Sequence, residues 1–155
     1  MVRFFGPVVR GLRLRGSILG AFRGTSLLGV CGIAPPGHCQ PTFREKLRVL
    51  PALVLGNPIG VPLRVLRWTS EWERRDPPQA HWHLGPVAVD PALQGQGVGS
   101  ALLQNFCTQM AERQALSYLE TDKSENVGFY QRFAYRVVAE GLVLGVPNWF
   151  MTRSP

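Results

Sequence analysis

Three glycines lie within five residues of the stretch VAVDPALQGQGVGSALL, which runs from Val87 to Leu103. The run before them reads as the end of a β-strand that stops at Asp90-Pro91, and residues 97–113 have the apolar spacing of a helix. At such a junction free backbone N–H groups meet the positive end of the helix dipole, and glycine leaves them uncovered. The stretch therefore predicts an anion site of the kind that binds phosphate.

Two common phosphate loops do not fit this junction. A P-loop ends in Gly-Lys-Ser or Gly-Lys-Thr, whereas Gly99 is followed by Ser100 and Ala101. A dinucleotide-binding fingerprint that begins at Gly95 needs a third glycine where this chain has Ser100, and its strand turns directly into the loop. The loop is neither a P-loop nor a dinucleotide-binding loop, so the residues that flank it must identify its type.

Apolar periodicity predicts a chain that alternates between strands and helices. A helix over residues 2–14 leads, and the second half of the chain runs strand, helix, strand, helix, strand, strand. This order predicts an α/β or α+β domain with a mixed sheet. The expected strands are 17–22, 27–33, 81–89, 117–121, 135–140 and 149–153, and the later helices are 42–54, 62–74, 97–113 and 126–133.

The composition limits the domain count and the cellular setting. A chain of 155 residues, 45% of them apolar, suits a single domain over residues 1–155. The three cysteines have no metal-ligand spacing, so we expect no disulfide framework, no metal and a reducing, cytoplasmic compartment. The most apolar stretch, residues 50–65, is too short and too interrupted by proline to span a membrane.

The net charge of +7 is unevenly distributed, because the first 44 residues hold six arginines and no acid. Such a start is compatible with a transit peptide or with a nucleic-acid patch. We favour a helix with a solvated basic face, because the chain carries no recognised nucleic-acid-binding motif. We therefore expect no nucleic-acid partner.

The stretch Gln94-Gly95-Gln96-Gly97-Val98-Gly99 matches the pattern Q/R-x-x-G-x-G/A and so resembles the acyl-CoA loop of the GNAT superfamily of N-acetyltransferases. The preceding strand and its Asp90-Pro91 exit match that superfamily as well. Its next strand, helix and strand are matched in order and spacing by residues 119–121, 125–130 and 133–137. The resemblance covers about residues 17–155 and is closest to the branch that contains puromycin N-acetyltransferase.

The resemblance implies the GNAT acyltransferase fold, with departures. Ala134 stands where the family has Gly, and Tyr135 stands where it has Phe. The chain also looks short of one strand and one helix, so residues 1–16 would hold a leading helix, 17–80 a hairpin and lid helices, and 81–155 the acetyl-CoA-binding core. The lacking elements belong to the acceptor side. A CoA-binding domain with little transferase activity therefore stays an alternative, and an unpaired sheet edge makes a homodimer an expectation.

The resemblance implies acetyl-CoA as co-substrate, held where the strands at 83–89 and 117–121 part. The glycine-loop backbone would bind the pyrophosphate, and the strand amides near Val87 would bind the pantetheine arm and polarise the thioester carbonyl. Asn126 would bond the pantetheine or cap its own helix. The donor site would comprise Val87, Ala88, Val89, Gln94, Gly95, Gln96, Gly97, Val98, Gly99, Ser100, Asn126 and Tyr130.

Transfer to an amine needs a base for the amine and an acid for the departing thiolate. Tyr130 occupies the family's general-acid position, although core packing also explains a Tyr there. The base stays open between Glu120, which burial would have to make basic at neutral pH, and His83, whose ordinary pKa suits the task. Because His83, Val87 and Val89 are all odd positions of one strand, we expect their side chains on one face.

The resemblance favours, as acceptor, the primary amine of a small, partly aromatic or apolar molecule. Apolar side chains between 41 and 79 would form a lid over this acceptor or, more simply, cover one face of the sheet. They are Phe43, Leu55, Leu66, Trp68 and Trp72.

Overall fold

A computed structural model describes residues 11, 13, 15–40, 42–55, 58 and 60–155. Gly11, Arg13 and Arg15 are helical, and the rest of the helix expected over 2–14 lies outside the described residues. The strands are β1 (Ser17–Arg23), β2 (Ser26–Ala34), β3 (Trp82–Val89), β4 (Ser117–Thr121), β5 (Arg136–Val143) and β6 (Val146–Arg153). The helices are α2 (Phe43–Leu55), α3 (Gly60–Glu73), α4 (Val98–Glu112) and α5 (Ser124–Gln131), with a 3₁₀ turn at Pro91–Leu93.

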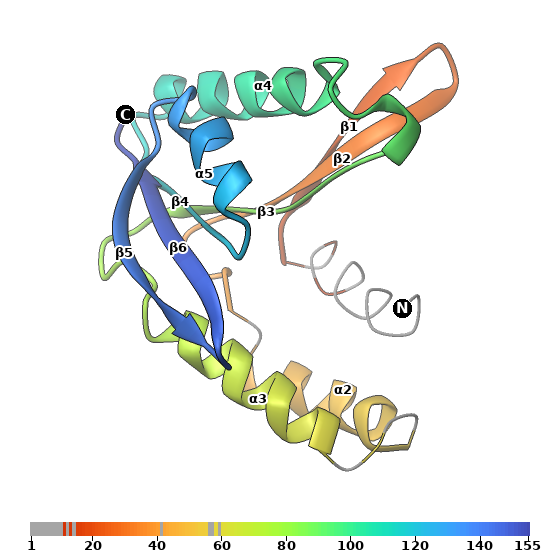
Figure 1. The fold of residues 1–155 in the computed structure, drawn as a ribbon, viewed down its shortest axis with the longest axis vertical. Coiled ribbons are helices and arrows are strands. Elements are labelled where there is room, and N and C mark those ends of the chain that lie inside the picture. Colours follow the sequence, from red (N-terminus) through yellow and green to blue (C-terminus); the bar gives the residue numbers. More distant parts are fainter. Residues whose placement is uncertain (1–10, 12, 14, 41, 56–57, 59) are drawn as a thin grey trace.

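The six strands form one mixed sheet in the order β1-β2-β3-β4-β6-β5, which confirms the α/β fold class expected from the sequence. Neighbours are antiparallel except β3 and β4, whose connection passes through α4. This parallel pair is joined only at Trp82–Ser117 and His83–Tyr118. Beyond these residues β3 stays with β2 and β4 stays with β6, so the sheet opens between β3 and β4 (Figure 1).

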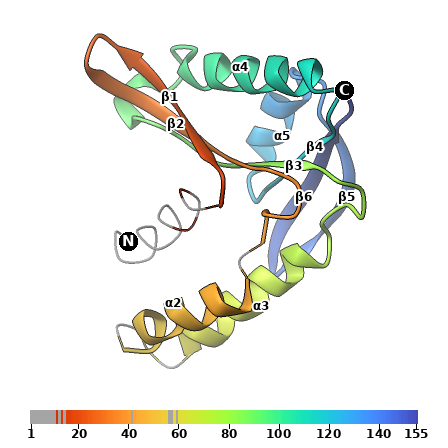
Figure 2. The same cartoon turned by 180° about the vertical axis from the view of Figure 1, so that it is seen from behind.

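Helices cover both faces of the sheet. α4 and α5 lie on one side and α2 and α3 on the other, as both ribbon views show (Figures 1 and 2). The main core lies under α4, where apolar side chains three and four positions apart face the sheet. Burying each of these large side chains stabilises the fold by about 1.5–3 kcal/mol. The buried α4 residues are Val98, Leu102, Leu103, Phe106, Cys107 and Met110.

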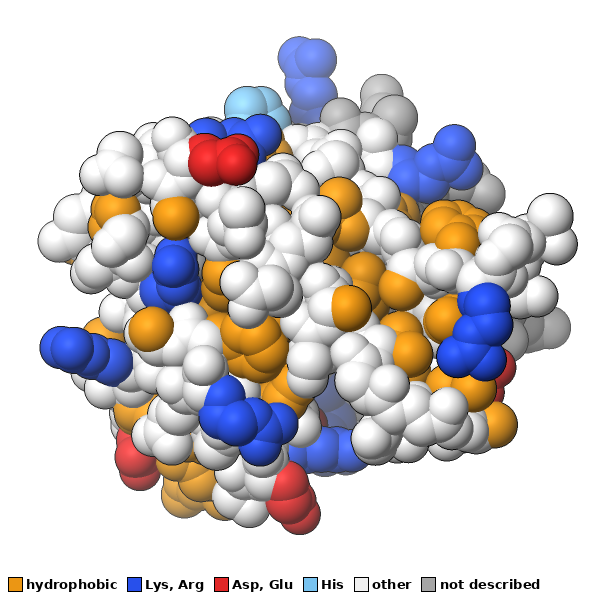
Figure 3. Space-filling model, turned by 90° about the horizontal axis from the view of Figure 1, so that it is seen from above, with side chains coloured by type: hydrophobic (Ala, Val, Ile, Leu, Met, Phe, Trp, Pro, Cys, Tyr) orange, Lys and Arg blue, Asp and Glu red, His pale blue; other side chains and the backbone are white. Residues whose placement is uncertain are grey.

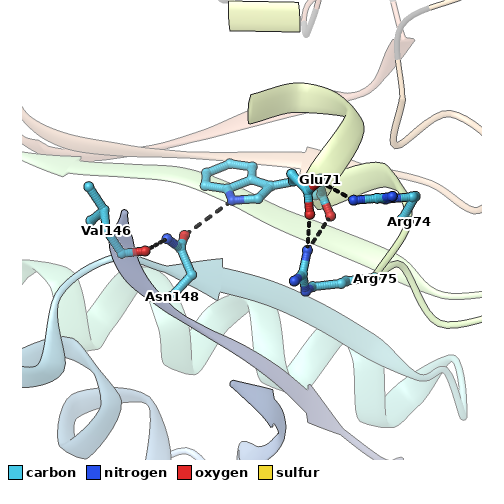
Figure 4. Close-up of polar contacts among 6 residues, drawn as sticks. Glu71, Arg74, Arg75, Val146 and Asn148 are labelled. Atoms are coloured by element: carbon cyan, nitrogen blue, oxygen red, sulfur yellow. Dashed lines mark hydrogen bonds and ion pairs between the residues drawn. The ribbon is translucent and has the colours of Figure 1, made fainter. Parts of the chain in front are cut away.

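The opposite face is covered by the end of α3. Trp68 and Trp72 pack against buried Tyr118 and Phe150, and Trp72 Nε1 donates a hydrogen bond of 3.1 Å to Asn148 Oδ1 on β6. Figure 4 shows this anchor beside the contacts of Glu71 with Arg74 and Arg75. The two tryptophans therefore cover a face of the sheet, which was the simpler of the two roles expected for them; the other was a lid over the acceptor.

The other apolar side chains expected between residues 41 and 79 to cover the sheet are exposed. Phe43 is 78% exposed and Leu55 is 87% exposed, and Leu66 is exposed as well. Exposure of this extent does not support their covering a sheet face.

A β-bulge in β3 contradicts the parity expected for His83. Between Cys31 and Ile33 of β2 the register shifts, so that Cys31 faces Val87 whereas Ile33 faces Leu84. The extra residue in β3 reverses the alternation of its side chains. Val87 and Val89 consequently pack in the core under α4, whereas His83 lies on the face of Tyr118.

Candidate active site

The glycine loop forms a bare helix start. Gly97 is the N-cap of α4 at φ +84°, no described side chain caps the helix, and Gly95 has φ +75°. These left-handed conformations favour glycine, and a Cβ built at either position would meet no atom within 4 Å. The first amides of α4 lie at the positive end of the helix dipole and follow glycines with open space beside them, which fits a pyrophosphate group.

The charge around α4 is compatible with an anionic ligand. In the view from above α4, hydrophobic side chains gather in the middle of the surface, and Lys and Arg side chains stand at several places around them together with a few Asp and Glu side chains (Figure 3). No acidic residue lies in the first turn of α4, where a negative side chain would compete with a bound phosphate.

The edge of β3 that faces β4 supplies backbone polar groups. Past His83 this edge has no partner strand among the described residues, although Val87, Ala88 and Val89 remain paired with β2 on the other side. Unpaired backbone N–H and C=O groups need partners, and an extended amide-containing ligand provides them. The opening between β3 and β4 therefore fits a pantetheine arm.

Tyr130 lies in the core on the side of α4 and is 8% exposed. Its ring packs edge to face on Phe129 and Tyr135, and its hydroxyl has no hydrogen-bond partner among the described residues. Burial, and then the negative charge of Glu120, raise the pKa of Tyr130 to about 12. The hydroxyl therefore keeps its proton at neutral pH and can donate it.

Asn126 holds α5 to β4 instead of capping the helix. The helix begins at Ser124 with Lys123 as N-cap, so the capping role expected for Asn126 is wrong. Asn126 Nδ2 donates a hydrogen bond of 3.2 Å to Thr121 Oγ1 at the end of β4. This contact fixes the start of α5 against the opening of the sheet.

His83 and Glu120 meet on the other face, where β3 and β4 part. His83 Nε2 lies 3.0 Å from Glu120 Oε2, and the Glu120 side chain is only 4% exposed. Burial by itself would lower the pKa of His83, but the negative charge of Glu120 and a contact with Cys39 outweigh it and raise that pKa well above its ordinary value. The two candidate bases are thus one buried ion pair that holds a proton at neutral pH.

Further titratable side chains surround this ion pair. The sequence by itself did not identify them as site residues. Cys39 Sγ lies 3.6 Å from His81 Nε2, and Asp76 Oδ2 accepts a hydrogen bond of 2.8 Å from Gln40 Nε2. The Tyr118 ring packs edge to face with the rings of both His81 and His83, with centroids 5.3 and 5.4 Å away. No local pattern could reveal this cluster, because Cys39 and His81 are 42 residues apart in the chain.

The structure therefore places the expected site residues on two sides of one opening. Tyr130 and the glycine loop lie on the side of α4, whereas His83 and Glu120 lie on the side of α3. The described residues hold no group of His, Cys, Asp and Glu suited to a metal ion. No described helix is long and apolar enough to cross a membrane.

Comparison with known families gives a match over most of the chain. A family model described as acetyltransferase (GNAT) family matches residues 11–135. The match includes β3, the glycine loop, α4, β4 and α5, which carry the arrangement just described.

Solved structures share the fold. A crystal structure titled histone acetyltransferase HPA2 and related acetyltransferase, from Corynebacterium glutamicum, has a TM-score of 0.71 at 20% identity and covers 99% of this chain and 72% of that one. The ribosomal-protein-S18-alanine N-acetyltransferase from Escherichia coli has a TM-score of 0.58 at 13% identity, covering 96% and 75%. An acetyltransferase from Bacillus subtilis in complex with CoA has a TM-score of 0.59 at 14% identity, covering 96% and 82%.

Proposed function

Because the chain belongs to the GNAT acetyltransferase family and is an acetyl-CoA-dependent acyltransferase, we propose that it acetylates the primary amine of a small molecule by direct attack of the amine. The observation that carries this proposal is the buried ion pair of His83 and Glu120, located where β3 and β4 part. The His83–Glu120 pair and Tyr130 lie on opposite sides of the opening. A base at the first and an acid at the second suit a reaction that removes one proton from an amine and adds another to a thiolate.

The donor half is assigned to backbone groups. Acetyl-CoA supplies an acetyl group activated as a thioester. Amides from Gln94 to Ser100 would hold its pyrophosphate, and the free edge of β3 near Val87 would hold its pantetheine arm and polarise the carbonyl. Asn126 would contribute by fixing the start of α5, through its hydrogen bond to Thr121.

The acid is assigned to Tyr130. Its hydroxyl is protonated at neutral pH, because burial raises its pKa to about 12, and no described residue accepts its hydrogen bond. A proton held in this way is available to a thiolate that forms beside it. The resulting tyrosinate is a strong base that regains its proton from solvent.

The base is assigned to the His83–Glu120 pair as a unit. In the protonated pair the imidazolium cannot accept a further proton, so the active form is the one in which His83 is neutral. The negative charge of Glu120 raises the pKa of His83 and therefore strengthens it as a base. The pair would act on the ammonium group of the acceptor as it enters.

The acceptor class is tested by an assay of CoA release with a panel of amines, after calorimetry with CoA and acetyl-CoA. The panel should contain small aromatic and aliphatic primary amines, and also peptides with N-terminal alanine or internal lysine, because two similar structures carry titles of protein acetyltransferases. We expect small amines to be acetylated preferentially. Preference for the peptides would overturn the small-molecule assignment, and binding of CoA without any turnover would favour a CoA-binding domain.

A homodimer is part of the same proposal. β1 is an outer strand of the sheet, and its neighbourhood exposes Ile18, Phe22 and Leu27. An unpaired edge beside apolar side chains favours pairing with a second copy of the chain. Sedimentation should give twice the mass of 17.2 kDa, and a value of 17.2 kDa over a range of concentrations would exclude the dimer.

A further inference from the structure

The loop before α2 brings the Cys39 thiol to His81, the residue that immediately precedes β3. Cys39 Sγ lies 3.6 Å from His81 Nε2, and the other ring nitrogen of His81, Nδ1, lies 2.8 Å from the backbone oxygen of Gln79. A carbonyl oxygen only accepts, so Nδ1 carries the proton and Nε2 of the neutral ring is left to accept a proton from Cys39. A nucleophile, a base and a group that orients the base are thus arranged in order.

The surroundings stabilise the ionised form of this pair. Burial would raise the pKa of the Cys39 thiol, but the imidazoles of His81 and His83 outweigh it and lower that pKa to about 7. The contact with Cys39 in turn raises the pKa of His81. The negative charge of Asp76 also raises the pKa of His81, and Glu120, which is paired with His83 at 3.0 Å, raises the pKa of His83. The thiolate and the imidazolium therefore support each other near neutral pH.

A second observation indicates that the cluster contains a polar group in need of a partner. Tyr118 is fully buried against His81 and His83, yet its hydroxyl has no hydrogen-bond partner in the described part of the chain. An unpaired buried hydroxyl costs about 1–3 kcal/mol, so a native structure satisfies it with a ligand or a water. Cys39 is partly exposed, whereas Cys31 and Cys107 are buried.

We propose that Cys39 and His81 form a nucleophilic dyad, a covalent modification site for small alkylating carbon electrophiles that adjoins the His83–Glu120 pair but uses a different nucleophile and base. The Cys39 proton moves to His81 Nε2, and the thiolate attacks the electrophilic carbon. A bond forms between carbon and sulfur while the bond from that carbon to its leaving group breaks, and the leaving group departs with the electron pair. This chemistry does not require acetyl transfer and is testable without it.

The test uses iodoacetamide on the full native chain, with the modified peptides identified by mass spectrometry across a pH series. Cys31 and Cys107 serve as internal controls, because they are 0% and 5% exposed and burial raises the pKa of each. We expect Cys39 to react first, with a rate that rises through a midpoint near pH 7. A midpoint at or above the ordinary cysteine value of about 8.5 overturns the proposal.

A matched pair of variants assigns the activation to His81. His81→Asn should move the midpoint upward by at least about 1 pH unit and slow the reaction at pH 7 about fivefold, since the loss of thiolate exceeds the gain in intrinsic nucleophilicity. His38→Ala is the control, because His38 is exposed and, among the described residues, its ring hydrogen-bonds only with the backbone oxygen of Pro36. An unchanged midpoint in folded His81→Asn overturns the dyad. If that variant does not fold, the midpoint of the unmodified chain still decides the proposal.

Discussion

His83 Nε2 and Glu120 Oε2 lie 3.0 Å apart across the point at which β3 and β4 part. The bulge in β3 creates this relationship. It leaves Val87 and Val89 in the core under α4 and places His83 on the other face, where Glu120 points from β4. Since both groups are buried, their charges interact more strongly than in water. The protonation state of His83 therefore depends on the charge of Glu120.

Tyr130→Phe should separate catalysis from donor binding. The substitution keeps the ring in its contacts with Phe129 and Tyr135 and removes only the hydroxyl. If that hydroxyl protonates the thiolate, kcat should fall about 10²-fold while the affinity for CoA stays within about twofold. Steady-state kinetics and calorimetry on the same preparation measure both quantities. A fully active variant would assign Tyr130 to core packing alone.

Gly99→Asp should weaken CoA binding without harming the fold. Gly99 lies in the first turn of α4, where a negative side chain is favourable to the helix itself. The same charge should repel a pyrophosphate and weaken CoA binding at least about tenfold, or about 1.4 kcal/mol. Gly99→Ala is the control, because an added Cβ would meet Phe129 and Val89 only at 3.6 and 3.7 Å, ordinary contact distances. Equal CoA affinities of the two variants in calorimetry would place the pyrophosphate elsewhere.

Ala134→Gly should stabilise the protein. Ala134 has φ +64° in the turn after α5, in the left-handed region that is unfavourable for a residue with a Cβ. Glycine relieves this strain, so the free energy of unfolding should rise by about 1 kcal/mol in urea titrations. Ala101→Gly, in the exposed face of α4, should have the opposite sign and cost about 1 kcal/mol. A loss of stability in Ala134→Gly would mean that no strain is stored at this position.

Much of the fold could be predicted because it depends on the local spacing of apolar residues. The strands beside the glycine loop, α4 and the order of elements in the second half follow from apolar spacing and from Gly and Pro. The β5–β6 hairpin was predicted too short, because its turn at Leu144-Gly145 places a leucine at φ +53°, which is no usual turn signal. The pairing of β5 with β6 over their full length holds this turn in place.

The parts of the site that could not be predicted depend on contacts between distant segments. The bulge in β3 exists only relative to β2, so alternation along β3 by itself put His83 on the wrong face. Cys39 meets His81 across 42 residues, and Tyr118 joins them from a third segment. Residue types along the chain named His83, Glu120 and Tyr130 as candidates, and only the fold shows that the first two form a pair.

The most direct test of the proposed base compares kcat against pH for the protein and for Glu120→Gln, at saturating acetyl-CoA and with one small amine. In the unmodified protein the rate should rise with pH above 7, because the charge of Glu120 raises the pKa of His83 and the imidazolium must lose its proton first. Without that charge burial lowers the pKa of His83, so the rise in Glu120→Gln should move at least about 1 unit toward acid. An unchanged profile would contradict the account, and loss of activity at every pH would assign the proton to Glu120 itself instead of His83.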